Sequence, residues 1–474
     1  MNIKKLLLLV FATLTIYSCS EDFVDDPAPV DGISEALVFS NRSMVDAFIA
    51  GMGRRMRAQF TTHDSNGINA IYYARNVKGN DIIQRRTWFT YDYENANREP
   101  NYRRPTFTWQ FSYYMINQAN IAIKGINESD LGTTDKNETL AQAHGIRAFW
   151  YFQLALEFCP AYLHTNPSTT DAPPVYTMPV TEGGPMSDLQ TMYDLIISDL
   201  ETAVTIASSS RIDKSYFNKN VLQGVLARVY LTTGEYAKAA SNAAAARQGY
   251  TLNRGQYRNG FSDMSASEWI WAAPQRSDQS NYYWGPPHAH ADHYVTSYAG
   301  TFFNVDFVNL FMNDNDYRNL FVNGYRAPDY DYRARITRKF TFSFSSDHPL
   351  MRSPEMMLIE AEGLARTGND AGARAILEEL QLNRIPTGYT PKGNSGSALI
   401  EEILVERRKE LYAEPPAVEW FDAKRLGRGI PRTGNHRVMG NADLTPNDKR
   451  FYLKVPLREI DANDNITDAV NDNR

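Results

Sequence analysis

The sequence predicts a mainly α-helical fold in which tetratricopeptide-like helix pairs are separated by long, loop-rich insertions. Helical hydrophobic periodicity is strong, strand patterns are weak, and two similar helix–glycine–helix segments lie 134 residues apart. A continuous array of such pairs would repeat about every 34 residues, so these pairs must be interrupted. No linker or charge block divides the chain after residue 34, and we therefore expect a single domain over residues 35–474.

The first three helices follow from periodicity and capping. Apolar residues recur at steps of three and four in two segments, which predicts helices over about 109–123 and 140–158. Ser187 and Asp188 provide an N-cap before a third periodic segment, which extends to about Ala207.

The two helix pairs share one layout. In the segments 227–239 and 361–373, a helix runs into a turn glycine, Gly234 or Gly368, and a second helix follows. Small residues stand where the two helices must touch, as in tetratricopeptide units.

The N-terminus has the features of an export signal. Lys4 and Lys5 precede an apolar run of 12 residues, which is too short to span a bilayer, so residues 1–18 are expected to be a signal peptide. Cys19 follows the small residue Ser18 and resembles the lipidated cysteine of a bacterial lipoprotein. The residues before Ser18 depart from the usual lipobox, which leaves a secreted protein's leader as the alternative.

The segment after the leader is expected to be an anchor and a tether. Residues 19–34 combine the candidate lipidated Cys19 with acids, prolines and little apolar content, as flexible tethers do.

Composition and motifs exclude several function classes. The chain has 474 residues, with 49 Lys and Arg against 55 Asp and Glu, so no overall positive field attracts nucleic acid. The sequence holds no H-E-x-x-H, G-x-S-x-G, phosphate-binding glycine loop or Cys-x-x-Cys motif. We therefore expect no enzymatic activity, no cofactor and no nucleic-acid partner, and we interpret Cys159 as a small buried hydrophobe.

One histidine cluster has residue types suited to zinc or copper. His288, His290 and His293, with Asp292 among them, lie within six residues. Because no second-shell partner can be identified for them, we interpret them as the polar rim of a binding loop and predict no metal.

The charged residues of the C-terminal helices are interpreted as structural. We expect a set of ion pairs on adjacent helical turns, exposed and worth about 0.3 to 0.5 kcal/mol each, among Glu406, Arg407, Glu410, Asp422 and Arg425. Arg147 and Glu362 are likewise expected to tie helix pairs together.

Aromatic residues are the main functional clue. The chain has 28 Tyr, 23 Phe and 7 Trp, and many of these rings fall in the insertions rather than in the periodic helices. Tyr and Trp combine a flat apolar face with a hydrogen-bonding edge, which suits a sugar ring, so we expect a polysaccharide ligand. The alternative is that the rings pack the loops against the helices.

Several segments together resemble the SusD/RagB family of nutrient-uptake lipoproteins of the Bacteroidetes outer membrane. They resemble the family patterns W-x3-Y-x2-I-x2-A-N, A-E-A-x3-R-A-F-x2-F, R-x-x-E-M-x-L-I-x-A-E, I-x2-E-R-x2-E-L and a closing hydrophobic-Pro segment, at Trp109–Asn120, Ala141–Phe152, Arg352–Glu362, Ile403–Leu411 and Tyr452–Leu457. The link Glu414–Trp420 departs from the family's short E-G-x-R-W, and the family's closing N-Q-N is reduced to Asn463–Asn465.

The resemblance implies a fold and a function. It implies a SusD-like fold and a cell-surface lipoprotein of the outer membrane that binds glycan and delivers it to a SusC-like TonB-dependent barrel. Ser20–Asp22 resembles the acidic surface-export signal of such lipoproteins. The alternatives are a RagB-like protein that takes up peptides and a surface adhesin without a transport role.

The resemblance also places the sugar-contacting surface in the aromatic insertions, although these loops do not align residue by residue. The expected ligand-binding residues are Trp88, Tyr91, Tyr93, Tyr282, Tyr283 and Trp284, with Arg75 and Asn80 as hydrogen-bonding neighbours.

Overall fold

The computed structural model describes residues 34–57, 62–276, 287–294, 299–311 and 315–474. The predicted signal peptide, Cys19 and nearly all of the predicted tether lie outside these residues. The described chain is mainly helical, as the sequence predicts.

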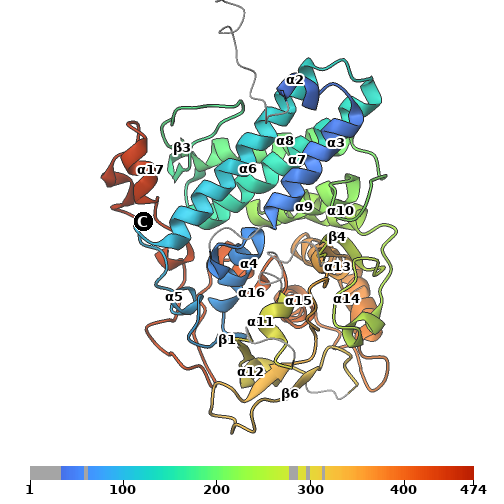
Figure 1. Cartoon of the computed structure of the whole chain (residues 1–474). Helices are drawn as coiled ribbons and strands as arrows, with labels where there is room; N and C mark the ends of the chain where they lie inside the picture. The colour runs from blue at the N-terminus through green and yellow to red at the C-terminus, as the bar shows by residue number, and fades with distance from the viewer. Residues whose placement is uncertain (1–33, 58–61, 277–286, 295–298, 312–314) are drawn as a thin grey trace, which may run out of the picture.

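A stack of antiparallel helices forms one end of the molecule (Figure 1). Helices α6 (Arg103–Glu128) and α7 (Thr133–Phe158) pack against each other, and α3 (Arg42–Met56) and α8 (Leu189–Ile206) lie beside them. Each of the first three predicted helices is present, and α6 starts six residues before the predicted boundary. Asp188 caps α8 as expected, since its side chain accepts a hydrogen bond from the Thr191 backbone N–H at 2.8 Å.

The two predicted helix pairs continue this stack. The first consists of α9 (Lys219–Thr233) and α10 (Tyr236–Ala246), and the second of α13 (Ser353–Arg366) and α14 (Asp370–Arg384). The turn glycines have φ of +82° at Gly234 and +87° at Gly368, in the left-handed region that favours glycine. Helix α10 packs directly on α13, so the insertion between them loops out of the helical stack.

The remaining helices are shorter or lie on the other side of the molecule. The α-helices are α2 (Glu35–Val38), α4 (Gly67–Val77), α5 (Thr90–Tyr93), α11 (Pro287–Ala291), α12 (Val305–Val308), α15 (Gly396–Leu411), α16 (Val418–Arg425) and α17 (Leu457–Ala462). Single 3₁₀ turns are η2 (His63–Ser65), η3 (Tyr162–His164), η4 (Pro167–Thr169), η5 (Arg254–Arg258), η7 (Lys449–Phe451) and η8 (Asp468–Asn471).

The strands of the described chain form small antiparallel pairs rather than a central sheet. The pairs are β1 (Ile82–Gln84) with β5 (Thr301–Phe303), β2 (Asp171–Ala172) with β3 (Ser187–Asp188), β4 (Trp269–Ala273) with β8 (His348–Arg352), and β6 (Phe321–Asn323) with β7 (Arg335–Thr337). Three of these pairs contain strands of the long insertion between α10 and α13. The pairs β4–β8 and β6–β7 form within the insertion, and β5 joins it to β1 of the earlier chain.

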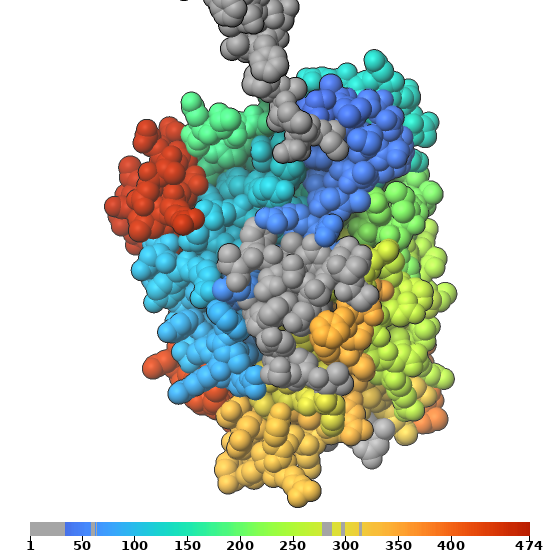
Figure 2. Space-filling view, viewed as in Figure 1, coloured from blue at the N-terminus to red at the C-terminus, as the bar shows by residue number. Residues whose placement is uncertain are grey.

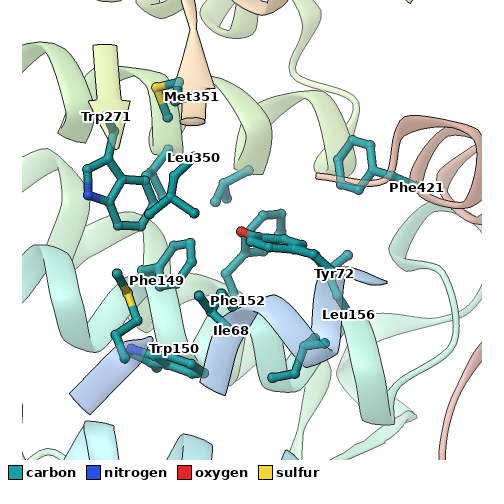
Figure 3. Close-up of a cluster of buried hydrophobic side chains, with 14 of the residues drawn as sticks. Ile68, Tyr72, Phe149, Trp150, Phe152, Leu156, Trp271, Leu350, Met351 and Phe421 are labelled. Atoms are coloured by element: carbon teal, nitrogen blue, oxygen red, sulfur yellow. The ribbon is translucent and has the colours of Figure 1, made fainter. Parts of the chain in front are cut away.

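Large aromatic and aliphatic side chains from distant segments meet in the core (Figure 3). The rings of Phe149 on α7 and Trp271 on β4 meet edge to face, with centroids 5.1 Å apart. Such rings bury about 150–250 Å² each, so this cluster ties α7 to the β4–β8 pair and to α4. The labelled members come from α4, α7, β4, β8 and α16: Ile68, Tyr72, Phe149, Trp150, Phe152, Leu156, Trp271, Leu350, Met351 and Phe421.

Two ion pairs form within the predicted C-terminal set, both to Asp422, from Arg407 and Arg425. The expectation that the set is exposed is wrong. Every member of the set is at most 7% exposed: Glu406, Arg407, Glu410, Asp422 and Arg425. Helix α15 lies against α13, α14 and α16, so its charged face is covered, and its carboxylates pair with arginines of other segments. Arg147 joins α7 to α8 through Asp199 at 2.7 Å, and Glu362 pairs with Arg425 at 2.6 Å, as expected for residues that tie helices together.

Candidate functional site

A cleft of about 780 Å³ opens at the start of α6. We call it the aromatic cleft and define it by its described lining residues: Asp64, Arg85, Thr87, Trp88, Phe89, Tyr91, Asn97, Asn101, Tyr102, Arg103 and His290. The light-blue segment that carries α5 and the start of α6 lies on the face shown in Figure 2.

The loop that carries two of the predicted platform residues is fixed by its buried neighbours. Phe89 is 1% exposed and packs edge to face on Tyr73, with ring centroids 4.6 Å apart. Asp92 is fully buried and accepts hydrogen bonds from Arg104 at 3.0 and 3.2 Å, which attaches α5 to α6. The neighbouring side chains of Trp88 and Tyr91 are therefore held outward, 46% and 61% exposed.

Three exposed rings line the cleft. The ring centroids of Tyr91 and Tyr102 are 6.3 Å apart, and the Arg103 guanidinium lies over the Trp88 ring at 5.5 Å from its centroid. Tyr102 is the N-cap of α6 and Arg103 its first residue, so a long helix sets the position of both. Exposed rings on a fixed backbone provide flat apolar faces without a large ordering cost.

The inner wall of the cleft is apolar and rigid. His290 on α11 stacks on Tyr73, with ring centroids 4.2 Å apart, and also meets Phe89 edge to face. The Tyr73 hydroxyl forms hydrogen bonds with Gln84 of β1 and Thr301 of β5, and burial raises the pKa of Tyr73. This wall therefore rests on the β1–β5 pair.

Asp64 contributes the one carboxylate among the described residues that line the cleft. It is 5% exposed, accepts a hydrogen bond from the Thr62 hydroxyl, and lies 3.6 Å from the Nε of Arg103. The cleft thus combines aromatic faces, amide groups and two guanidinium groups.

Arg75 lies away from the cleft, which corrects the prediction that it contacts ligand. It is 1% exposed, and its Nε donates to Glu157 at 2.5 Å and its Nη1 to Gln153 at 2.9 Å. Burial alone would raise the pKa of Glu157, but the charges of Arg75 and Lys78 lower it overall. Arg75 therefore compensates a buried acid on α7.

Tyr93 is also removed from the predicted surface. It is fully buried, and its hydroxyl lies 2.8 Å from Nδ1 of His436, whose Nε2 donates to the Asn80 carbonyl at 3.0 Å. Burial lowers the pKa of His436 to about 3, so the ring is neutral and its Nδ1 accepts a hydrogen bond from the Tyr93 hydroxyl. Tyr93 thus anchors the loop from below.

Asn80 does not line the aromatic cleft. Its amide donates to the Thr433 hydroxyl at 3.1 Å, and its carbonyl oxygen accepts from the Thr433 backbone N–H at 2.8 Å. The side chain therefore fastens the C-terminal segment to the β1 loop.

Tyr282, Tyr283 and Trp284 lie outside the described residues. The neighbouring histidine cluster is dispersed, because His288 donates to the Phe261 carbonyl at 2.5 Å, His290 stacks in the cleft wall, and His293 donates to the Thr301 carbonyl at 2.7 Å. Within the described ranges, no group of three His, Cys, Asp or Glu side chains is placed to hold a metal ion.

The sequence does not predict most of the polar lining of the cleft, and four of the residues that it misses are Tyr102, Arg103, Asn101 and Asp64. The first three directly precede the periodic segment that revealed α6, and exposed aromatic and basic residues at a helix start were the available signal. Asp64 comes from a distant turn, and nothing in its local sequence connects it to the cleft.

No helix in the part of the chain that the structure describes combines the length and apolar character needed to cross a bilayer.

Two family models match the sequence in separate regions. The model described as "Starch-binding associating with outer membrane" matches residues 22–231, and the model of the SusD family matches residues 341–471. Together the two regions span well over half of the chain and include α5, the start of α6 and the C-terminal helices.

The sequence is similar to the SusD-like protein P38 of Formosa agariphila. The two are 26% identical over 408 residues, which cover 73% of this chain and 77% of that protein.

Solved structures share the fold. A SusD-like carbohydrate binding protein from Bacteroides vulgatus superposes with a TM-score of 0.81 at 24% identity, over 90% of this chain and 97% of that one. A SusD superfamily protein from Bacteroides thetaiotaomicron superposes with a TM-score of 0.75 at 21% identity, over 90% of this chain and 99% of that one. A laminarin-binding SusD-like protein superposes with a TM-score of 0.70 at 17% identity, over 90% of this chain and 98% of that one. With both family models and the relative in agreement, the chain belongs to the SusD/RagB family.

Proposed function

We propose that this protein is a cell-surface lipoprotein that captures an oligo- or polysaccharide in the aromatic cleft and delivers it to a SusC-like TonB-dependent transporter of the outer membrane. The observation that carries the proposal is the set of exposed rings, Trp88, Tyr91 and Tyr102, held on a buried and hydrogen-bonded frame.

The chemistry of the cleft suits sugar rings. The axial C–H groups of a pyranose pack on aromatic faces, and its hydroxyl groups need donors and acceptors at the ring edge. Asn101, Thr87 and the hydroxyls of Tyr91 and Tyr102 supply such groups around the rings. A cleft of this volume is within the usual range for a small-molecule site.

The family supports the same ligand class. One matching model is described as starch-binding, and a neighbour of the same fold is described as laminarin-binding. Both ligands are polysaccharides, so we propose a polysaccharide ligand for this protein and do not assign its sugar.

Membrane anchoring and transport complete the proposal. The lysine-containing leader followed by Cys19 supports a lipid anchor, and the family description associates its members with the outer membrane. In this scheme the helical stack is a rigid body that docks on the barrel, while the loops select the ligand. A RagB-like role in peptide uptake is the alternative, since exposed rings also bind peptide side chains.

A glycan array and a peptide library, probed with the mature protein and with Trp88→Ala, test the cargo. We expect glycan signals that the substitution reduces, and peptide signals alone would contradict the glycan function. Purification of the tagged native protein from detergent-solubilised outer membranes tests the partner, because a TonB-dependent barrel should copurify with it. Recovery of the intact lipoprotein without any barrel would favour an adhesin.

A further inference from the structure

The aromatic cleft is lined by more positive than negative charge. Arg85 and Arg103 both line it, and Asp64 is the one acidic residue among its described lining residues. The surrounding sequence has the same bias, because residues 51–110 contain ten Lys and Arg against five Asp and Glu, whereas the whole chain has 49 against 55. The excess of basic residues is therefore local to this part of an acidic chain.

Arg103 is placed to meet a ligand rather than to pack in the core. Its side chain is 51% exposed and stacks over the Trp88 ring, 5.5 Å from the centroid. Arg104 beside it is 2% exposed and donates to Asp92 at 3.0 and 3.2 Å. The two adjacent arginines thus have different roles, one structural and one at the mouth of the cleft.

Asp64 only partly offsets the charge of Arg103. The two side chains are 3.6 Å apart, beyond a direct hydrogen bond, and Asp64 already accepts a hydrogen bond from Thr62. The planar guanidinium can still present parallel N–H groups to an anion, the geometry in which arginine binds carboxylates and oxyanions well.

We propose, on the basis of the glycan function above, that the cleft selects glycans that carry anionic groups, uronate carboxylates or sulfate esters. Sugar rings would stack on Trp88 and Tyr91, and the anionic substituent would bind Arg103 and Arg85. The proposal thus assigns the ligand-contacting role to Arg103 in place of the buried Arg75.

Matched polysaccharides in affinity gel electrophoresis test this proposal. Polygalacturonate and its fully methyl-esterified form differ in the carboxylates, and dextran sulfate and dextran differ in the sulfates. We expect retardation by the charged member of at least one pair, at least fivefold stronger than by its neutral partner, and weakening as NaCl is raised from 50 to 500 mM.

Variants separate charge from stacking. Arg103→Gln should remove most of the preference for charged over neutral polysaccharides, and Arg103→Lys should retain part of it. Trp88→Ala should weaken the binding of every glycan that the wild type binds. Arg86→Gln is the matched control, because Arg86 is exposed and adjacent to Arg85 but does not line the cleft.

The outcomes are distinguishable. Equal retardation by charged and neutral partners, or a preference unchanged by Arg103→Gln, would overturn the anionic-glycan proposal and leave glycan binding intact. A preference for charge that Arg86→Gln reduces as much as Arg103→Gln would show a diffuse surface field and would also overturn it. Retardation by none of these four polysaccharides would overturn it as well, and a blank glycan array in addition would contradict the glycan function itself.

Discussion

Replacing Arg352 with methionine would remove the centre of the buried ion cluster that joins β8 to the C-terminal helices. Arg352 is 1% exposed and contacts three carboxylates, at 2.7 Å in Glu414, 3.0 Å in Glu410 and 3.1 Å in Glu268. Burial alone would raise the pKa of Glu410, and the charges of Arg384 and Arg352 hold it well below its usual range. Methionine fills similar volume but leaves this buried negative charge undercompensated.

The expected cost follows from the burial of the partners. Removing one member of a buried ion pair costs about 3–5 kcal/mol, because the remaining charge stays in a low dielectric. Arg384 still contacts Glu268 and Glu410, and Lys339 still contacts Glu414, so we expect the lower part of that range.

Urea unfolding followed by circular dichroism measures the free energy of unfolding, with Arg428→Met as the matched control. Arg428 pairs with Glu401 at the surface, with side chains 47% and 53% exposed, and its loss should cost at most about 1 kcal/mol. If both variants lost the same small free energy, the buried cluster would not stabilise the fold in the way described.

Further predictions concern pH, packing and anchoring. Burial lowers the pKa of His288 to about 4, below its unfolded value near 6.5, so the neutral ring stabilises the fold above pH 6.5. That contribution, about 3 kcal/mol, should be lost as the pH falls from 7 to 4. The free energy of unfolding should therefore depend less on pH in His288→Gln than in the wild type, whereas substitution of the exposed His164 by Gln should not reduce this dependence. A Cβ at Gly363 would lie 2.5 Å from the Tyr236 carbonyl oxygen, so Gly363→Ala should lower the melting temperature, with a cost of about 1–3 kcal/mol, whereas Gly51→Ala in open space should raise it. Cys19→Ala should release the protein from the outer membrane, and a mutant that remains acylated and membrane-bound in fractionation would contradict the lipoprotein proposal.

Much of the helical architecture could be predicted because its signals are local. Periodicity located α6, α7 and α8, the Asp188 cap fixed the start of α8, and the turn glycines marked the two helix pairs. Each of these signals depends on residues within a few positions of one another, so one sequence is enough to read them.

The burial of the charged helix α15 could not be predicted, because it depends on distant segments of the chain. Its amphipathic pattern fits a solvated helix, and the arginines that cover its carboxylates come from segments 26 to 92 residues away, such as Arg384 and Arg318. A local pattern of charges carries no information about which distant segment will cover it.

Only part of the candidate site can be inferred from the sequence, because the exposure of each ring depends on residues far away in the chain. The sequence marks the aromatic segment 88–93 as a unit, but its rings alternate between exposed and buried positions, and the sequence does not state which is which. Tyr93 turns inward because His436, more than 300 residues later, binds its hydroxyl. Asp64 and Arg103 join the site only through the tertiary fold.

The most direct test of the central claim is titration calorimetry of the best glycan from the array against the wild type, Trp88→Ala and Tyr330→Ala. An aromatic platform is worth about 0.5–1.5 kcal/mol beyond area burial, so Trp88→Ala should weaken binding from a few-fold to tenfold or more. Tyr330 is 85% exposed and does not line the aromatic cleft, so its substitution should leave the affinity unchanged. Unchanged affinity in a stably folded Trp88→Ala variant would contradict the assignment of the aromatic cleft as the glycan-binding site.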